Sequence, residues 1–321
     1  MTFDEYLKTI KEIKKNEVTV NTYFTKWICP TKKYLSPYFG EKPLEDITFT
    51  EIRKYFLENK LLAHKTLKSH FQVLNTVLKW AQYDGLIERN PCEVYKLNVG
   101  VPTKDRQCYT PEQAELILDY CRRRPVDGIG VFIMLKTGIC RAEMLGIKWQ
   151  DIHLKERTIE IRRNIIEQQG EYEGERVVEA PTKNKHRNRE IAIDEDTALM
   201  IAKLPRFITV GANKHKHRPG TVVATEYLIV NKYGNCQSPS NWSKRRYKPF
   251  MEQMSDFYAE KGIDIPVLTP HCLRHTRASI WLNEGKSPTA IAAQMGWSDL
   301  DMLSRIYGHR DIKQLRELLG L

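Results

Sequence analysis

Apolar residues recur at helical spacing through the first hundred residues of the chain. The clearest predicted helix runs from Thr66 to Tyr83. Its apolar stripe, spaced by three and four residues, consists of Leu67, Phe71, Leu74, Leu78 and Ala81. Shorter apolar patterns in residues 6–10, 20–38 and 52–56 predict further helices. We therefore expect residues 1–100 to form a helical bundle.

Strands join the helices in the second part of the chain. Thr110-Pro111 begins a helix with a capping residue and a proline at the first helical position. The apolar run from Ile129 to Leu135 predicts a buried helix, which Gly138 ends. Alternating apolar and polar positions predict three strands, at 158–165, 176–178 and 189–193. Helices return after the third strand and dominate from residue 241 onward.

These patterns predict a mainly α fold with a small antiparallel β-sheet, divided into two domains. The helical bundle occupies residues 1–100, a polar linker residues 101–108, and an α+β domain residues 109–321. A chain of 321 residues exceeds the usual size of one domain, and 41% hydrophobic residues can fill two cores.

Two short helices are predicted near the C-terminus. The first carries Leu273 to Leu282 and stops at Gly285, and the second begins at Ser287-Pro288 and ends at Gly296. A third short pattern, 300–306, precedes a tyrosine. Folded against one another, these helices would bring together the chemically active side chains His271, Arg274, Trp297 and Tyr307. A cation, a proton carrier and a weak oxygen nucleophile together suit attack on a phosphodiester.

The charge balance points to a polyanionic partner. The chain has 51 Lys and Arg against 40 Asp and Glu, a net charge of +11, and nucleic acid is the simplest partner for such an excess. The polar side of the helix at 66–83 supplies candidate DNA contacts: Lys65, Lys68, His70 and Lys79. Seven Cys without a CxxC pair argue against a disulfide framework or a zinc ribbon. The chain contains no apolar run of membrane-spanning length. We expect a cytoplasmic, nucleoid-associated protein with no membrane contact and no metal.

Four blocks stand in one order along the chain. They are TGICRAEMLGIKWQDI (137–152), TKNK…REIAI (182–193), HCLRHT (271–276) and MGW…IYGH (295–309). This series resembles the tyrosine recombinases, of the phage and conjugative-transposon integrase type. The resemblance implies that the first domain binds core DNA sites and that the second domain is catalytic. Members of the family cut DNA through a covalent 3′-phosphotyrosine and exchange strands through a Holliday junction.

The resemblance also implies roles for the residues of the C-terminal blocks. Tyr307 would be the nucleophile, and Arg274 would donate two N–H groups to the scissile phosphate. His271 would bond the same phosphate and handle protons. Trp297 stands where many relatives have a second His, and its indole N–H can donate but cannot shuttle a proton. We expect His275 to satisfy a buried partner rather than to touch DNA.

The basic turn at 183–188 matches the family's mobile hairpin. Lys183 would protonate the departing 5′-oxygen, although Lys185, two residues on, would point the same way and remains an alternative. Arg187 is a further candidate DNA contact. Glu143 would support the arginine of the first block without contacting the DNA itself.

The first block departs from the family pattern. Relatives read T-G-x-R-x-x-E, and here Thr137 and Glu143 keep their spacing while Cys140 occupies the position of the Arg. Arg141 follows one residue later, a rotation of about 100° on a helix. Either Cys140 replaces the first catalytic Arg and cleavage is impaired, or an irregular helix start lets Arg141 reach the phosphate. We favour the first interpretation.

Three rival classes of protein fit parts of the sequence. His271 and His275 have the spacing of a metal-binding pair, but the zinc-peptidase motif requires Glu where Cys272 stands. The second rival is a DNA-binding protein that cleaves poorly, and the third is a chromosome-dimer resolvase. The Trp297 variant and the long hairpin at 165–190 favour a mobile-element integrase. The resemblance further implies a homotetramer on double-stranded core-site DNA, accessory DNA-bending or directionality factors, and no cofactor.

Overall fold

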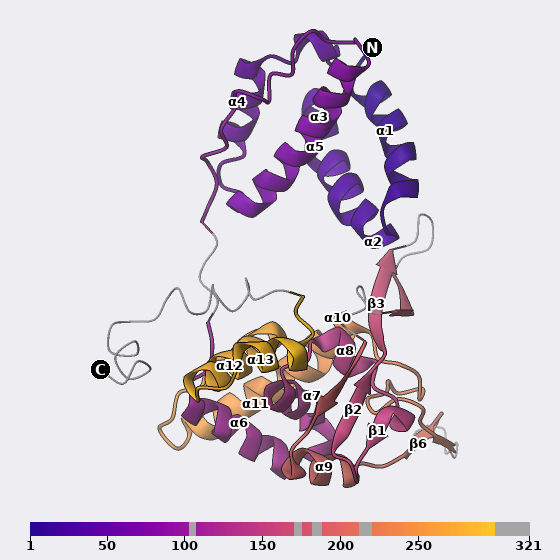
Figure 1. The fold of residues 1–321 in the computed structure, drawn as a ribbon, viewed down its shortest axis with the longest axis vertical. Coiled ribbons are helices and arrows are strands. Elements are labelled where there is room, and N and C mark those ends of the chain that lie inside the picture. The colour runs from indigo at the N-terminus through magenta and orange to yellow at the C-terminus, as the bar shows by residue number, and fades with distance from the viewer. Residues whose placement is uncertain (103–106, 170–174, 182–187, 212–219, 299–321) are drawn as a thin grey trace. The chain divides into compact units, whose positions relative to one another are not determined.

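The computed structural model describes the chain except for residues 103–106, 170–174, 182–187, 212–219 and 299–321. The expected site residues Lys183, Lys185, Arg187 and Tyr307, and part of the expected linker, lie outside the described residues. The chain divides into two compact units (Figure 1). The first contains Met1–Asp105 with Gln168–Gly174, and the second contains Arg106–Glu167 with Glu175–Leu321.

The first unit is helical. Its α-helices are α1 (Phe3–Glu17), α2 (Val20–Tyr23), α3 (Ser36–Phe39), α4 (Phe49–Glu58) and α5 (His64–Tyr83). Two π-helical stretches, η1 (Phe24–Ile28) and η2 (Thr31–Leu35), join α2 to α3, and a 3-10 turn, η3 (Leu44–Asp46), precedes α4. The apolar pattern at 20–38 is therefore one helical stretch with two widened turns. The chain begins α1 with a capping box, in which Thr2 and Glu5 satisfy each other's backbone N–H groups.

One face of α5 lies in the core of this unit. Its buried residues are Leu67, His70, Val73, Leu74, Val77, Leu78 and Ala81. The expectation that His70 contacts DNA is wrong, because its side chain is only 1% exposed. Its Nδ1 lies 2.9 Å from the hydroxyl of Tyr55, and burial lowers the pKa of the imidazole to about 4. His70 is a neutral core residue.

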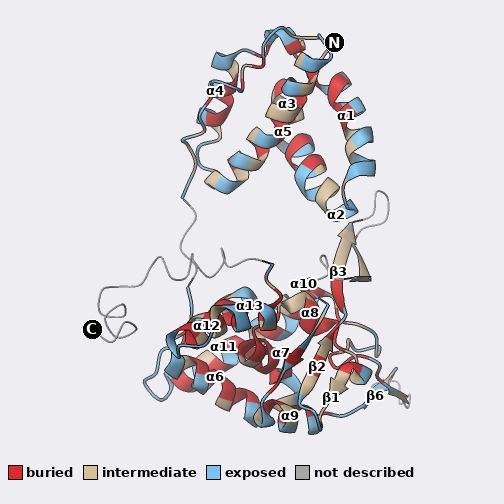
Figure 2. Ribbon diagram, viewed as in Figure 1, coloured by how far each residue is buried: buried red, intermediate tan, exposed pale blue. Residues whose placement is uncertain are grey.

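The second unit is built around α7 (Pro125–Thr137). The α-helices around it are α6 (Pro111–Arg123), α8 (Arg141–Leu145), α9 (Glu195–Ala202), α10 (Pro239–Trp242), α11 (Lys248–Ala259), α12 (Pro270–Asn283) and α13 (Pro288–Met295). The 3-10 turn η4 (Trp149–Asp151) and the π-helical η7 (Ser243–Tyr247) belong to the same unit. Residues 128–135 of α7 are all buried, and Figure 2 shows most of this helix as buried, whereas the outer helices expose one face.

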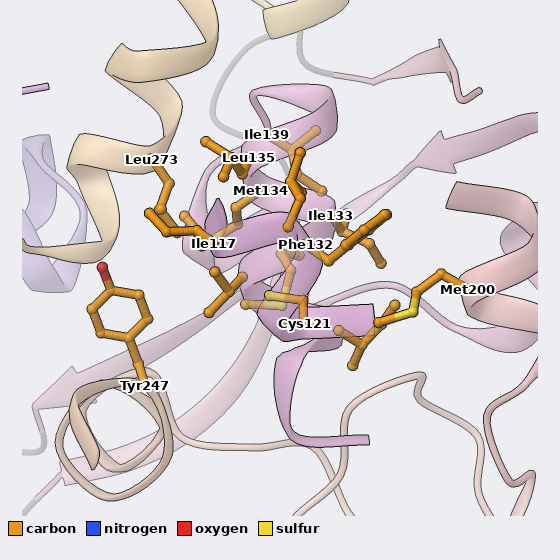
Figure 3. Close-up of a cluster of buried hydrophobic side chains, with 14 of the residues drawn as sticks. Ile117, Cys121, Phe132, Ile133, Met134, Leu135, Ile139, Met200, Tyr247 and Leu273 are labelled. Atoms are coloured by element: carbon orange, nitrogen blue, oxygen red, sulfur yellow. The ribbon is translucent and has the colours of Figure 1, made fainter. Parts of the chain in front are cut away.

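Side chains from the surrounding helices meet on α7. Figure 3 shows its Phe132, Ile133, Met134 and Leu135 amid Ile117 and Cys121 of α6, Met200 of α9 and Leu273 of α12. The helix ends at Gly138, whose φ of +70° suits a residue without a side chain. Because α7 is apolar all round, as the run at 129–135 predicts, it fixes the position of its own C-terminal end.

The strands form small antiparallel sheets. β1 (Ile152–His153), β2 (Thr158–Ile161) and β5 (Arg189–Ala192) make one sheet in the order β1-β2-β5. β3 (Arg163–Gln169) pairs with β4 (Glu175–Pro181), and β6 (Phe207–Val210) with β7 (Thr221–Ala224). The predicted strand at 158–165 is two strands, with exposed Arg162 between them. The β6–β7 pair was not predicted from the sequence.

The fold class is confirmed: a helical first domain precedes an α+β second domain with small antiparallel sheets. Among the helices that the structure describes, none has the length and apolar character to cross a bilayer.

Candidate active site

The helix α12 carries three polar side chains on one face. His271, Arg274 and His275 are spaced by three and four residues, so they project from the same side of the helix. His271 is exposed, whereas Arg274 and His275 are 4% and 6% exposed. The two imidazole rings pack edge to face with centroids 4.6 Å apart. The His nearest the helix start is therefore the accessible one, and His275 is buried beneath it.

Arg274 joins three parts of the second unit. Its Nη1 donates to the carbonyl of Gly138 at the end of α7, and its Nη2 to the carbonyl of Met295 at the end of α13, both at 2.8 Å. The ring of Trp297 lies 5.0 Å from the guanidinium carbon. The structure thus brings Arg274 and Trp297 together, with His271 one turn earlier on α12. The guanidinium is held rigidly, as a site that must bind an anion in one position requires.

Glu143 lies behind this arginine and is 1% exposed. Its Oε2 accepts the backbone N–H of Cys140 at 3.0 Å, and its carboxylate lies 3.8 Å from Arg274 Nη1. Arg189 of β5 donates to both carboxylate oxygens, at 3.1 and 3.2 Å. Burial alone would raise the pKa of Glu143, but the hydrogen bonds and charge of Arg189 outweigh it and hold this pKa below its ordinary value. Glu143 is a buried carboxylate that stays ionised.

Cys140 and Arg141 point to different surroundings. Cys140 is the N-cap of α8, with extended backbone angles of φ −81° and ψ 161°. Burial, and then the charge of Glu143, raise the pKa of its thiol, which is therefore neutral at neutral pH. Arg141 instead donates from Nη1 to Ser243 Oγ at 2.5 Å on η7, and its charge contributes to lowering the pKa of Glu167. Cys140 is the residue beside Glu143 and Arg274.

In the described part of the chain, the positive charge of the site comes from arginine side chains. Groups of three or more His, Cys, Asp or Glu side chains able to hold a metal ion are absent among these residues. The candidate DNA contacts Lys65, Lys68 and Lys79 are exposed on α5, as a surface role requires.

Arg189 is the residue that the sequence interpretation missed. Its strand alternates so that Arg189 shares a face with Ile191 and Ile193, which are buried. A period of two therefore already placed a charged side chain on the inner face, where it needs a carboxylate. That signal could have indicated a buried acidic partner for Arg189, but not which carboxylate supplies it.

The chain belongs to the phage integrase family, the tyrosine recombinases, whose family model matches residues 107–314. The model of the phage integrase central domain matches residues 3–97. The two matches correspond to a core-binding domain followed by a catalytic domain.

Curated relatives include integrases of mobile elements. The chain is 23% identical over 297 residues to a XerC-like tyrosine recombinase of Caldanaerobacter subterraneus subsp. tengcongensis, covering 87% of this chain and 71% of the relative. It is 22% identical to the ICEBs1 integrase of Bacillus subtilis, with 86% and 71% covered. The match to the transposase of Tn916 from Enterococcus faecalis spans 59% of that protein.

Solved structures share the fold. The Tn1549 transposon integrase in complex with transposon right end DNA has a TM-score of 0.77 at 19% identity, and the match covers 100% of this chain and 99% of that one. A lambda integrase tetramer bound to a Holliday junction has a TM-score of 0.65 at 17% identity, with 97% and 78% covered.

Proposed function

We propose that the chain is a site-specific DNA recombinase of a mobile genetic element. It cuts and rejoins DNA strands through a covalent 3′-phosphotyrosine at Tyr307 and a Holliday junction. One observation carries the proposal: a buried Arg274 is held by the ends of α7 and α13 and packs against Trp297, one helical turn from the exposed His271. The family membership and the integrase and transposase relatives support it.

The chemistry follows from the charges. The Tyr307 oxygen attacks phosphorus, the bond to the 5′-oxygen breaks, and the 5′-oxygen takes a proton from Lys183. Lys185 is the alternative donor. A phenol has a pKa of about 10 and is a poor nucleophile, so the phosphate must be neutralised and held in line. Arg274 supplies the charge, and His271 bonds the phosphate and moves the proton of the phenol. Attack of a 5′-hydroxyl on the phosphotyrosine then restores the strand.

Trp297 restricts this proton transfer. Its indole N–H can donate a hydrogen bond to the phosphate, but the indole cannot accept a proton and pass it on. Its ring also lies against the guanidinium of Arg274. We therefore assign it a binding and orienting role, which leaves His271 as the imidazole that faces the substrate.

Because Cys140 is neutral, strand cleavage should be slow. In its place the family's pattern has an arginine, and loss of one group that stabilises developing charge costs about 10²–10³ in rate. A second candidate function is therefore a DNA-binding protein of the same family with impaired cleavage. Arg141 does not compensate in this proposal, because it is bonded to Ser243.

The DNA interface extends to the first domain. We propose that Lys65, Lys68 and Lys79 of α5, with Arg187 beside the catalytic lysine, contact the phosphates of a core site. The lambda integrase relative was solved as a tetramer on a Holliday junction, and we propose the same stoichiometry here. Accessory DNA-bending or directionality factors would set the outcome, and the site of action is the nucleoid in the cytoplasm.

The test is formation of a covalent adduct. A core site is first selected from random duplex DNA with the Tyr307→Phe protein, which can bind without cutting. The unaltered protein is then incubated with that site carrying a nick, which traps the cut strand. We expect a protein–DNA adduct resistant to denaturant, with a free 5′-hydroxyl on the released strand.

The control is Tyr307→Phe, which should bind the same DNA and form no adduct. Specific binding with an adduct only in Cys140→Arg would favour the impaired variant. An adduct that persists in Tyr307→Phe would contradict the assignment of the nucleophile.

A further inference from the structure

A buried ion-pair cluster lies behind the proposed phosphate site. The carboxylate of Glu143 is 1% exposed and the side chain of Arg189 8% exposed, and they form a two-pronged pair at 3.1 and 3.2 Å. Arg274 lies 3.8 Å from the same carboxylate. Two guanidinium groups therefore share one buried negative charge.

The two arginines are not equivalent in this cluster. Arg189 makes the close, bidentate bonds to Glu143, a geometry that favours strong pairing. Arg274 donates to two neutral carbonyls, those of Gly138 and Met295, and lies farther from the carboxylate, at 3.8 Å. The charge of Glu143 is therefore balanced mainly by Arg189, and the cluster of one carboxylate and two guanidinium groups keeps a net charge of +1.

We propose that Arg189 is a positioning residue for the phosphate site: it neutralises Glu143, so that the charge of Arg274 remains available to the DNA phosphate. This inference rests on the proposed function. Without Arg189, Glu143 would be a buried carboxylate whose remaining charged partner in the cluster is Arg274. It would draw that guanidinium into a close pair, and the net charge behind the phosphate would fall to zero.

Arg189 also holds the end of α13. Its Nε donates to the carbonyl of Gln294 at 2.9 Å. The Gln294 side chain accepts the N–H of Ala192 at 3.1 Å and donates to its carbonyl at 2.8 Å, as a neighbouring strand would. Trp297 lies two residues beyond the end of α13, and its ring packs against Arg274. The same side chain thus fixes the charge of the site and the helix end that carries its indole.

The experiment separates the charge effect from a loss of structure. The Tyr307→Phe protein is bound to its selected duplex, in which single phosphates are replaced in turn by uncharged methylphosphonates. The phosphate held by Arg274 is the one whose replacement weakens binding most, and we expect a loss of about tenfold, typical for a hydrogen-bonded charge.

Adding Arg189→Gln should reduce that loss to less than about twofold. The cluster of Glu143 and Arg274 then has no net positive charge, so it no longer distinguishes a charged phosphate from an uncharged methylphosphonate. Adding Glu143→Gln as well should restore it, because removal of the carboxylate returns the charge to +1. If Arg189 had a structural role alone, Arg189→Gln would weaken binding to the unmodified and the methylphosphonate duplex equally. The double variant would then bind more weakly than either single variant. That result, or no sensitive phosphate in the parent, overturns the proposal.

Two further variants sharpen the comparison. Arg189→Lys keeps the charge without the bidentate geometry, and it should retain most of the methylphosphonate effect even if α13 loosens. Arg162→Gln, an exposed arginine between β2 and β3, removes the same charge elsewhere and should leave the effect unchanged. The readout needs no cleavage, so absence of the Tyr307 adduct would refute the enzymatic function without affecting this result.

Discussion

Replacing Cys140 by Arg should strongly increase strand cleavage. Cys140 begins α8 with its thiol neutral and its backbone N–H bonded to Glu143. An arginine there would raise the net charge of the cluster around Glu143 from +1 to +2. A preorganised donor to a phosphate in the transition state contributes about 3–4 kcal/mol. Part of this is offset, since a third guanidinium near two others costs about 1–2 kcal/mol.

We therefore expect Cys140→Arg to increase the rate of adduct formation by about 10- to 10²-fold, with a fall in Tm of a few degrees in the free protein. The assay is the single-turnover rate on the nicked core site at saturating protein. Arg141→Ala should change the rate little, because its guanidinium is bonded to Ser243 on η7. Cys140→Ala is the matched control that removes the thiol without adding a charge, and it should also have little effect.

The reverse pattern would refute the reasoning. If Arg141→Ala abolished cleavage while Cys140→Arg left it unchanged, the catalytic arginine would be Arg141, and α8 would have to rearrange when DNA binds.

Three further predictions concern stability and metal dependence. His70 is neutral in the folded protein because burial lowers its pKa to about 4. The unfolded state binds the extra proton between roughly pH 6.5 and 4, so the stability of the first unit should fall by on the order of 2–3 kcal/mol over that window. Denaturant unfolding at several pH values checks this, and His70→Gln should remove most of the dependence. Gly296→Ala should destabilise the second unit more than Gly285→Ala in thermal melts. Both positions have positive φ, but only at Gly296 would the new Cβ lie 2.6 Å from a side-chain atom of Arg189, while Gly285 faces open space. Adduct formation should survive excess chelator, and its loss there would favour metal chemistry at His271 and His275.

The helices that the sequence pattern predicted best are those whose apolar periodicity is strong. α5 and α7 have the expected positions, because an amphipathic stripe or an all-apolar run has one low-energy environment. The predicted stripe on α5 is too narrow, however. Val73 and Val77 are buried with it, and so is His70, which its polar residue type placed on the wrong face.

Short elements were predicted less well. The pair β6–β7 and the two-residue β1 have little pattern of their own, and tertiary hydrogen bonds define them. The break between β2 and β3 at Arg162 likewise depends on different pairing partners on each side.

By itself, the sequence determined the family, the order of the two domains and the types of residue that the site uses, because spaced motifs and apolar periodicity are local properties of the chain. Only the tertiary structure decided what those residues face. It placed Arg141 on Ser243 and Cys140 beside Glu143, and it paired Arg189 with an acid 46 residues away. Burial and charge balance depend on all the surrounding elements at once, so no local pattern contains them.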